Sequence, residues 1–139
     1  MTPDAKNRYC LQCDDGTALV HTTKDVHGEI MGVPYSVKGV TGWHCPACGE
    51  IEYDLQGDSA ARMSAAVEAA GQEARQRQAL ALRAARKKLG LSQAEAGRLF
   101  GGGVSAFSEY ERGKTQPHKS TVLLMRLLDK HPNLLAEVR

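Results

Sequence analysis

The chain has 139 residues, of which 42% are hydrophobic and 24% charged, and this balance excludes wholesale disorder. No run approaches the roughly 18 apolar residues of a membrane span, and no secretion signal opens the chain, so we expect a cytoplasmic protein without disulfides. Residues 1–70 carry 5 Lys and Arg against 10 Asp and Glu (−5), whereas residues 71–139 carry 13 against 6 (+7). The second half therefore suits a polyanionic partner.

The first half is predicted to form strands and turns. Residues 18–23 and 35–43 are rich in β-branched and aromatic side chains, as is typical of strands. Four glycines are expected to punctuate these strands: Gly28, Gly32, Gly39 and Gly42.

A helix is predicted to follow, capped by Asp58 or Ser59 and interrupted at Gly71. We place the domain boundary there, with one domain over 1–70 and a second over 71–139. A continuous helix through Gly71 is the alternative, because one internal glycine costs only about 1 kcal/mol.

The second half is predicted to be entirely helical. Gly90 is expected to end its first helix, and Ser92 with Glu95 forms a capping box at the start of the second. Five helices are expected, over residues 80–89, 92–100, 104–112, 119–130 and 133–138.

Four cysteines are arranged as two C-x2-C pairs: Cys10 with Cys13, and Cys45 with Cys48. Two intervening residues let a tight turn direct both thiolates at one ion, and two such turns complete the tetrahedral shell of Zn(II). The alternatives are two disulfides, which need an oxidising compartment, or a redox pair, which needs a C-x2-C at the start of a helix. We predict one Zn(II) per chain, held by these four residues.

The predicted zinc site is structural, because four thiolates leave no open position for a catalytic water. Residues 1–57 contain few large apolar side chains, so the metal should supply much of the folding free energy of this part. His44 is a rival ligand beside Cys45, but we expect it to face solvent or to lie behind the ligands. An enzyme would need a three-ligand open site, which is not evident, so we predict that the protein is not an enzyme. The predicted class is α+β: a small β-rich zinc-binding domain followed by a five-helix domain.

The helices around the glycine run Gly101 to Gly103 fit a helix-turn-helix that begins at Gln93. Small residues fall where two helices must approach closely, at Ala96 and Gly97. A plain helical bundle would use the same apolar pattern. The residues predicted to contact DNA are Gln93, Gly103, Ser105, Ala106, Ser108, Glu109, Arg112, Lys114, Thr115 and Lys119.

A phosphate-binding loop is excluded by spacing, because G-x-x-x-x-G-K-[ST] needs a glycine where Ser108 stands. Two glutamates on the expected recognition helix would then meet DNA differently. Glu111 should lie on the inner side, paired with a basic residue such as Arg98 or capping nearby backbone. Glu109 should face outward and accept a hydrogen bond from cytosine N4.

Several segments match a known family pattern: Ser92-Gln93, F-G-G-G-V, A-F-S, Y-E, G-x-x-Q-P-H, L-D-K-H-P, the paired C-x-x-C and Val33-Pro34-Tyr35. Together they resemble MqsA-type antitoxins, which join a YgiT-type four-cysteine zinc finger to an Xre-like helix-turn-helix. The resemblance implies an antitoxin of a type II toxin–antitoxin pair. Its zinc domain would neutralise an RNase toxin that cleaves mRNA, and its second domain would form a homodimer and repress its own operon at a palindromic operator.

The resemblance has one departure. In the best-known pattern the positions of Ser105 and Glu109 hold an Asn and an Arg that read bases, so a different operator sequence is expected here. The alternative function is a stand-alone transcriptional regulator whose zinc site is structural or senses metal or oxidant, since zinc-bound thiolates can be oxidised.

Overall fold

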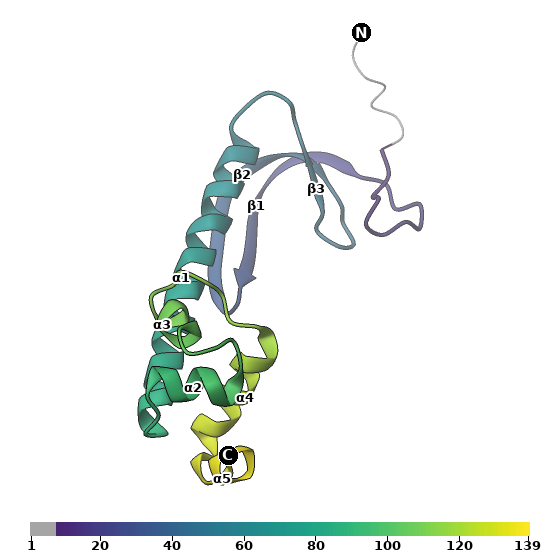
Figure 1. Cartoon of the computed structure of the whole chain (residues 1–139). Coiled ribbons are helices and arrows are strands. Elements are labelled where there is room, and N and C mark those ends of the chain that lie inside the picture. Colours follow the sequence, from purple (N-terminus) through teal and green to yellow (C-terminus); the bar gives the residue numbers. More distant parts are fainter. Residues whose placement is uncertain (1–7) are drawn as a thin grey trace. The chain divides into compact units, whose positions relative to one another are not determined.

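The computed structural model describes residues 8–139 of the chain. The chain divides into two compact units, one ending at Gly71 and the other spanning Gln72–Arg139. The first unit contains a small sheet and the second a group of short helices, coloured green to yellow in Figure 1.

The sheet has three antiparallel strands in the order β1-β2-β3, with bounds Val20–Ile30, Val33–His44 and Ile51–Tyr53. β1 and β2 form a long hairpin whose two-residue turn is Met31 and Gly32. Both turn residues have positive φ, 48° and 84°. Positive φ at both positions matches a type I′ turn, whose twist suits the right-handed twist of paired strands.

Both long strands extend beyond the predicted ranges, because glycines expected to mark turns lie inside strands. Gly28 of β1 pairs with Tyr35 of β2, and a Cβ at Gly28 would lie 2.4 Å from Tyr35 Oη. A Cβ at Gly42 of β2 would lie 2.7 Å from the carbonyl oxygen of Glu52. Without a side chain, these glycines allow close contacts between neighbouring strands. The strand boundaries predicted at Gly28 and Gly42 are therefore wrong.

The core of the first unit lies between β2 and the first turns of helix α1 (Ser59–Lys88). Val37 and Val40 of β2 and Met63 of α1 are buried there. The amide of Thr41 donates to Ser59 Oγ at 3.0 Å, which ties the start of the helix to the sheet. A core this small supplies little stability by itself.

Helix α1 runs without a break from Ser59 to Lys88 and passes through Gly71. The interruption predicted at Gly71 is therefore wrong, and the continuous helix is correct. Ala, Gln, Glu and Arg surround this glycine, and as good helix formers they offset the roughly 1 kcal/mol that it costs.

The second unit packs its helices against the C-terminal part of α1, with bounds α2 (Gln93–Phe100), α3 (Ala106–Glu111), α4 (Lys119–Lys130), η1 (Pro132–Leu134) and α5 (Leu135–Val138). The core residues of this unit are Leu82, Ala85, Leu91, Ala96, Phe107 and Met125. α2 begins with the predicted capping box: Glu95 N–H donates to Ser92 Oγ at 3.1 Å, and Ser92 N–H donates to Glu95 Oε2 at 2.8 Å. α3 begins two residues later than predicted, after the turn.

The predicted α+β class is confirmed over residues 8–139, with a small antiparallel sheet followed by a region of about five helices. None of the helices in this range has both the length and the apolar character that a membrane span requires.

Candidate metal centre and nucleic-acid interface

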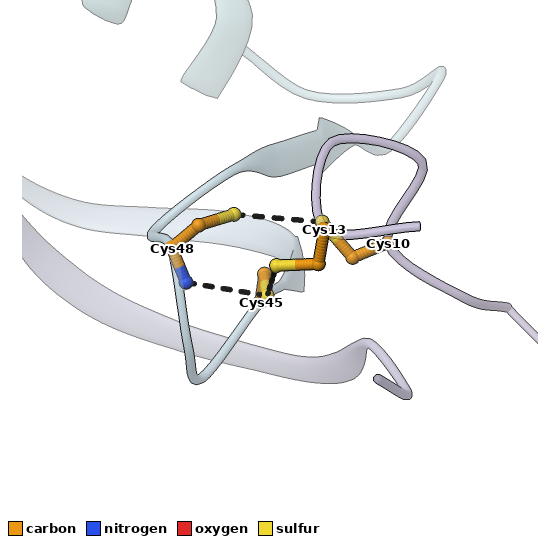
Figure 2. A group of neighbouring side chains, drawn as sticks. All are labelled: Cys10, Cys13, Cys45 and Cys48. Carbon is orange, nitrogen blue, oxygen red and sulfur yellow. Dashed lines mark hydrogen bonds between the residues drawn. The ribbon is translucent and has the colours of Figure 1, made fainter. Parts of the chain in front are cut away.

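The four cysteines come from two loops of the first unit. Cys10 and Cys13 lie in the loop before β1, and Cys45 and Cys48 lie in the turn after β2. Figure 2 shows the four side chains converging from these two segments. Each loop folds back on itself: Asp14 N–H donates to the Cys10 carbonyl at 3.1 Å, and Gly49 N–H donates to the Cys45 carbonyl at 3.3 Å. Together the two loops form one candidate metal-binding group.

The sulfur atoms have the spacing of a tetrahedral metal shell. All four lie within 4.8 Å of one another, with 3.5 Å between Cys10 and Cys48 and 3.8 Å between Cys13 and Cys45. Four thiolates at the usual Zn–S distance of about 2.3 Å would be about 3.8 Å apart. All four cysteines are free, so the two-disulfide alternative does not describe this structure. The donor set and its geometry fit a single tetrahedral ion.

Backbone amides of the second loop polarise one of the thiols. Cys48 N–H and Ala47 N–H point at Cys45 Sγ, at 3.5 and 3.4 Å. Chiefly the Cys48 amide, together with that of Ala47, lowers the pKa of the Cys45 thiol to about 6. The neighbouring Cys48 thiol raises the pKa of Cys13 above its ordinary value. A divalent cation would replace the protons that these four sulfur atoms otherwise share.

His44 lies apart from the cysteine group, since the metal-ligand set consists of the four cysteines. The imidazole is buried, with 2% exposure, and its Nε2 lies 3.0 Å from the Val40 carbonyl oxygen. Of the two expectations for His44, solvent exposure is wrong. The ring instead anchors the end of β2 just before the second cysteine pair.

In the turn between α2 and α3, the backbone of Gly103 lies close against Gly97 of α2. A Cβ at Gly97 of α2 would lie 1.9 Å from the carbonyl oxygen of Gly103, so no larger residue fits without displacing the turn. Ala96 is fully buried beside it. Gly101, Gly102 and Gly103 all have positive φ. The predicted need for a small residue at Gly97 is confirmed, and Ala96 is buried where a small residue was expected.

Most residues predicted to contact DNA are accessible. Gly103, Ser105, Arg112, Lys114, Thr115 and Lys119 are exposed, and Gln93, Ser108 and Glu109 are half-buried. Ala106, which we expected at the margin of the outward face, is buried, with 6% exposure, because it packs beside Gly102 of the turn. Contact of all these residues with DNA stays a prediction.

Glu111 forms a buried network that joins three helices. Its carboxylate accepts from Arg86 Nε at 2.5 Å, Arg86 Nη2 at 3.1 Å and Gln93 Nε2 at 2.6 Å. Arg86 also donates to the Leu91 carbonyl at 2.8 Å. The predicted inner placement of Glu111 is confirmed, and so is its pairing with a basic residue; that residue is Arg86 of α1, where Arg98 was the example we expected.

Burial by itself raises the pKa of Glu111, but the hydrogen bonds from Arg86 and Gln93 outweigh it, so this pKa lies below its ordinary value. The side-chain amide of Gln93, a residue predicted to contact DNA, thus donates a hydrogen bond to Glu111 within the protein. Arg86 was not identified from the sequence as the partner of Glu111, because residue type alone does not distinguish a buried arginine from its exposed neighbours in a basic helix. Its spacing from the core residues Leu82 and Ala85 was the available signal.

Glu109 lies at the outer side of α3, where Thr115 Oγ1 donates to its Oε2 at 3.4 Å. Arg112 Nε donates to the Ser108 carbonyl at 3.2 Å, which leaves its two terminal amino groups for other partners. Thr115, in the segment after α3, therefore donates a neutral hydrogen bond to the Glu109 carboxylate and leaves its negative charge in place.

These features define a two-unit α+β protein that combines a four-cysteine metal-ligand group with a bundle of short helices around a tight glycine turn. The chain belongs to the MqsA antitoxin family, since residues 8–139 match the family described as the antitoxin component of a bacterial toxin–antitoxin system, MqsA. It is 39% identical to Antitoxin MqsA of Escherichia coli (strain K12) over 130 residues, which cover 94% of this chain and 98% of that relative. The resemblance seen in the sequence motifs is thereby confirmed.

Proposed function

We propose that this protein is a type II antitoxin that neutralises an RNase toxin through its first unit and represses its own operon through its second. The observation that carries the proposal is the 39% identity to an antitoxin over nearly the full length of both chains. The proposed mechanism is binding without catalysis, and operator DNA would place it in the cytoplasm.

Zn(II) is the metal we assign to Cys10, Cys13, Cys45 and Cys48, one ion per chain, on the strength of the four-sulfur geometry. When bound, the ion would lock the two loops together at one end of the sheet. The role is structural, because the four thiolates fill a tetrahedral shell.

The first cysteine loop offers a surface for the toxin. Leu11 stands between two ligands and is 91% exposed, a position that a metal-organised loop would hold rigidly. Residues 1–70 carry a net charge of −5, which suits a basic partner such as an RNase. We therefore place the toxin contact on the unit that contains the metal group.

The second unit would bind the operator as a helix-turn-helix, with α2, the glycine turn and α3 as the motif. α3 and the preceding Ser105 would then present Ser105, Ser108 and Glu109 to the major groove, while Lys114 and Thr115 would contact phosphates. Two copies would place their recognition helices about 34 Å apart on a palindrome.

A homodimer would bring two such units together. Leu123 and Leu127 lie one turn apart on α4 and are each 48% exposed, and Val138 of α5 is 38% exposed. Exposed apolar side chains at this spacing form a stripe that a second copy could cover.

Replacing Glu109 with Gln should change base preference at one operator position more than it changes general affinity. The carboxylate can only accept, which favours cytosine N4, whereas an amide also donates and suits adenine. A binding-site selection with both proteins would measure the change. Glu137→Gln, which removes the same charge from exposed α5, should leave the selected sequence unaltered; an unaltered sequence for Glu109→Gln would show that Glu109 does not read a base.

Co-expression with the product of the adjoining reading frame tests the function as a whole. We expect the two proteins to co-purify and this chain to restore growth that the neighbour alone arrests. Growth arrest without rescue would contradict neutralisation. A harmless neighbour would favour the stand-alone regulator, whose thiolate centre senses metal or oxidant; Cys48 is exposed enough to react.

A further inference from the structure

An open groove lies within the second unit, beside the end of α3. Its volume is about 440 Å³, and it runs between the middle of α1 and the end of α3. From α1 come the polar residues Gln72, Arg75 and Gln76 and the apolar residues Ala79 and Leu80. The end of α3 and the residues after it contribute Glu111, Arg112 and Gly113.

The groove carries two guanidinium groups that are available to a ligand. Arg75 is exposed, and its side chain makes no hydrogen bond or ion pair with any residue of the range 8–139. Arg112 is exposed, and within the described part of the chain its side chain donates only through Nε. The nearby arginine Arg77 is different, because it forms an ion pair with Glu73.

The one acidic residue in the groove does not oppose an anion. Both carboxylate oxygens of Glu111 accept hydrogen bonds from Arg86 and Gln93, and the side chain is 4% exposed. Its charge is therefore compensated inside the protein. The polar surface of the groove is left with two cations and the amides of Gln72 and Gln76, all of which can donate hydrogen bonds, while Ala79 and Leu80 form its apolar part.

We propose that this groove binds a backbone phosphate of the operator, held by Arg75 of α1 together with Arg112. This inference rests on the proposed DNA binding and adds a phosphate site from outside the helix-turn-helix. Gly113 of the groove is followed directly by Lys114 and Thr115, the residues proposed to contact phosphates, so the groove adjoins that proposed phosphate-binding segment. Guanidinium groups suit phosphate because they can donate two parallel hydrogen bonds.

A bond to a phosphate has a signature that base reading lacks. Its removal should weaken binding equally on any sequence and reduce the salt dependence of affinity. Arg75→Gln in the full-length protein should therefore lower affinity for the DNA upstream of the gene and for a scrambled duplex of equal length by the same factor. The slope of log affinity against log salt should fall by about 0.9 for each phosphate that is no longer neutralised, so the advantage of the wild type shrinks by about 3.5-fold between about 50 and 200 mM salt.

Arg77→Gln is the matched control, since it removes the same charge two residues further along the same helix. Its salt slope should equal that of the wild type. A wild-type slope for Arg75→Gln, or an equal reduction in both variants, would overturn the inference, as would an effect of Arg75→Gln confined to the upstream sequence. If the wild type binds neither duplex, the proposed repressor function fails and this inference fails with it.

Discussion

Removing the metal from the full-length protein should unfold the sheet while the second unit keeps its helices. Among the described residues, the buried cluster between the sheet and α1 is small, consisting of Val37, Val40 and Met63, so we expect the cysteine loops to depend on the ion. Structural zinc in small domains contributes about 10–16 kcal/mol of apparent binding free energy, far more than such a core supplies. Amide hydrogen exchange before and after chelation would measure the effect: β2 amides should lose protection and α4 amides should keep it.

A ligand substitution separates the metal from side effects of the chelator. Cys45→Ser should reproduce the loss of protection in β2, because a hydroxyl is a poor zinc ligand at neutral pH. Gln12→Ser, in the same loop as two ligands but exposed, should leave the sheet intact. A loss of protection in β2 and α4 together would contradict the independence of the two units, and a sheet unaffected by chelation would contradict the structural role of the metal.

Glu111→Ala should destabilise the second unit by about 3–5 kcal/mol, because it leaves the charge of Arg86 buried and unpaired. Arg86 has 8% exposure, so solvent cannot replace the missing carboxylate. Urea unfolding followed through α4 amides would measure the change. Glu109→Ala, on the same helix with no buried partner, should cost less than about 1 kcal/mol.

The same network should make the second unit sensitive to acid. The pKa of Glu111 is lowered in the folded protein, so the stability that it contributes is present above its unfolded value of 4.5 and is lost as the pH falls below it. Arg86→Met with Glu111→Leu should abolish this dependence and restore much of the stability, because a well-packed apolar pair can replace a buried ion pair. An acid response that persists in the double variant would assign it to other carboxylates.

Local chemistry made the metal group predictable. Two C-x2-C pairs are typical of a four-thiolate metal site, and the close sulfur atoms are what that spacing predicts. The capping box at Ser92 and the small residues at Ala96 and Gly97 were also predictable, since each depends on groups within a few residues or on a turn of fixed geometry.

Features that depend on distant parts of the chain were not predictable in the same way. Gly28 reads as a turn residue until Tyr35 is placed across the hairpin, and Gly71 reads as a helix end although the helix continues. The partner of Glu111 was chosen from nearby arginines, but burial selected Arg86, which lies 25 residues away.

The sequence by itself therefore determined the family, the four-cysteine group and the change from a β-rich first half to a helical second half, because cysteine spacing, capping and apolar periodicity act over short stretches. Only the tertiary structure decided which charges are buried and which remain free. Three arginines of one helix show the difference. Among the described residues, Arg75 lies unpaired in the groove, Arg77 pairs with Glu73 on the surface, and Arg86 is buried against Glu111. Burial and the position of the opposing carboxylate make that distinction, and both arise only when the helices pack.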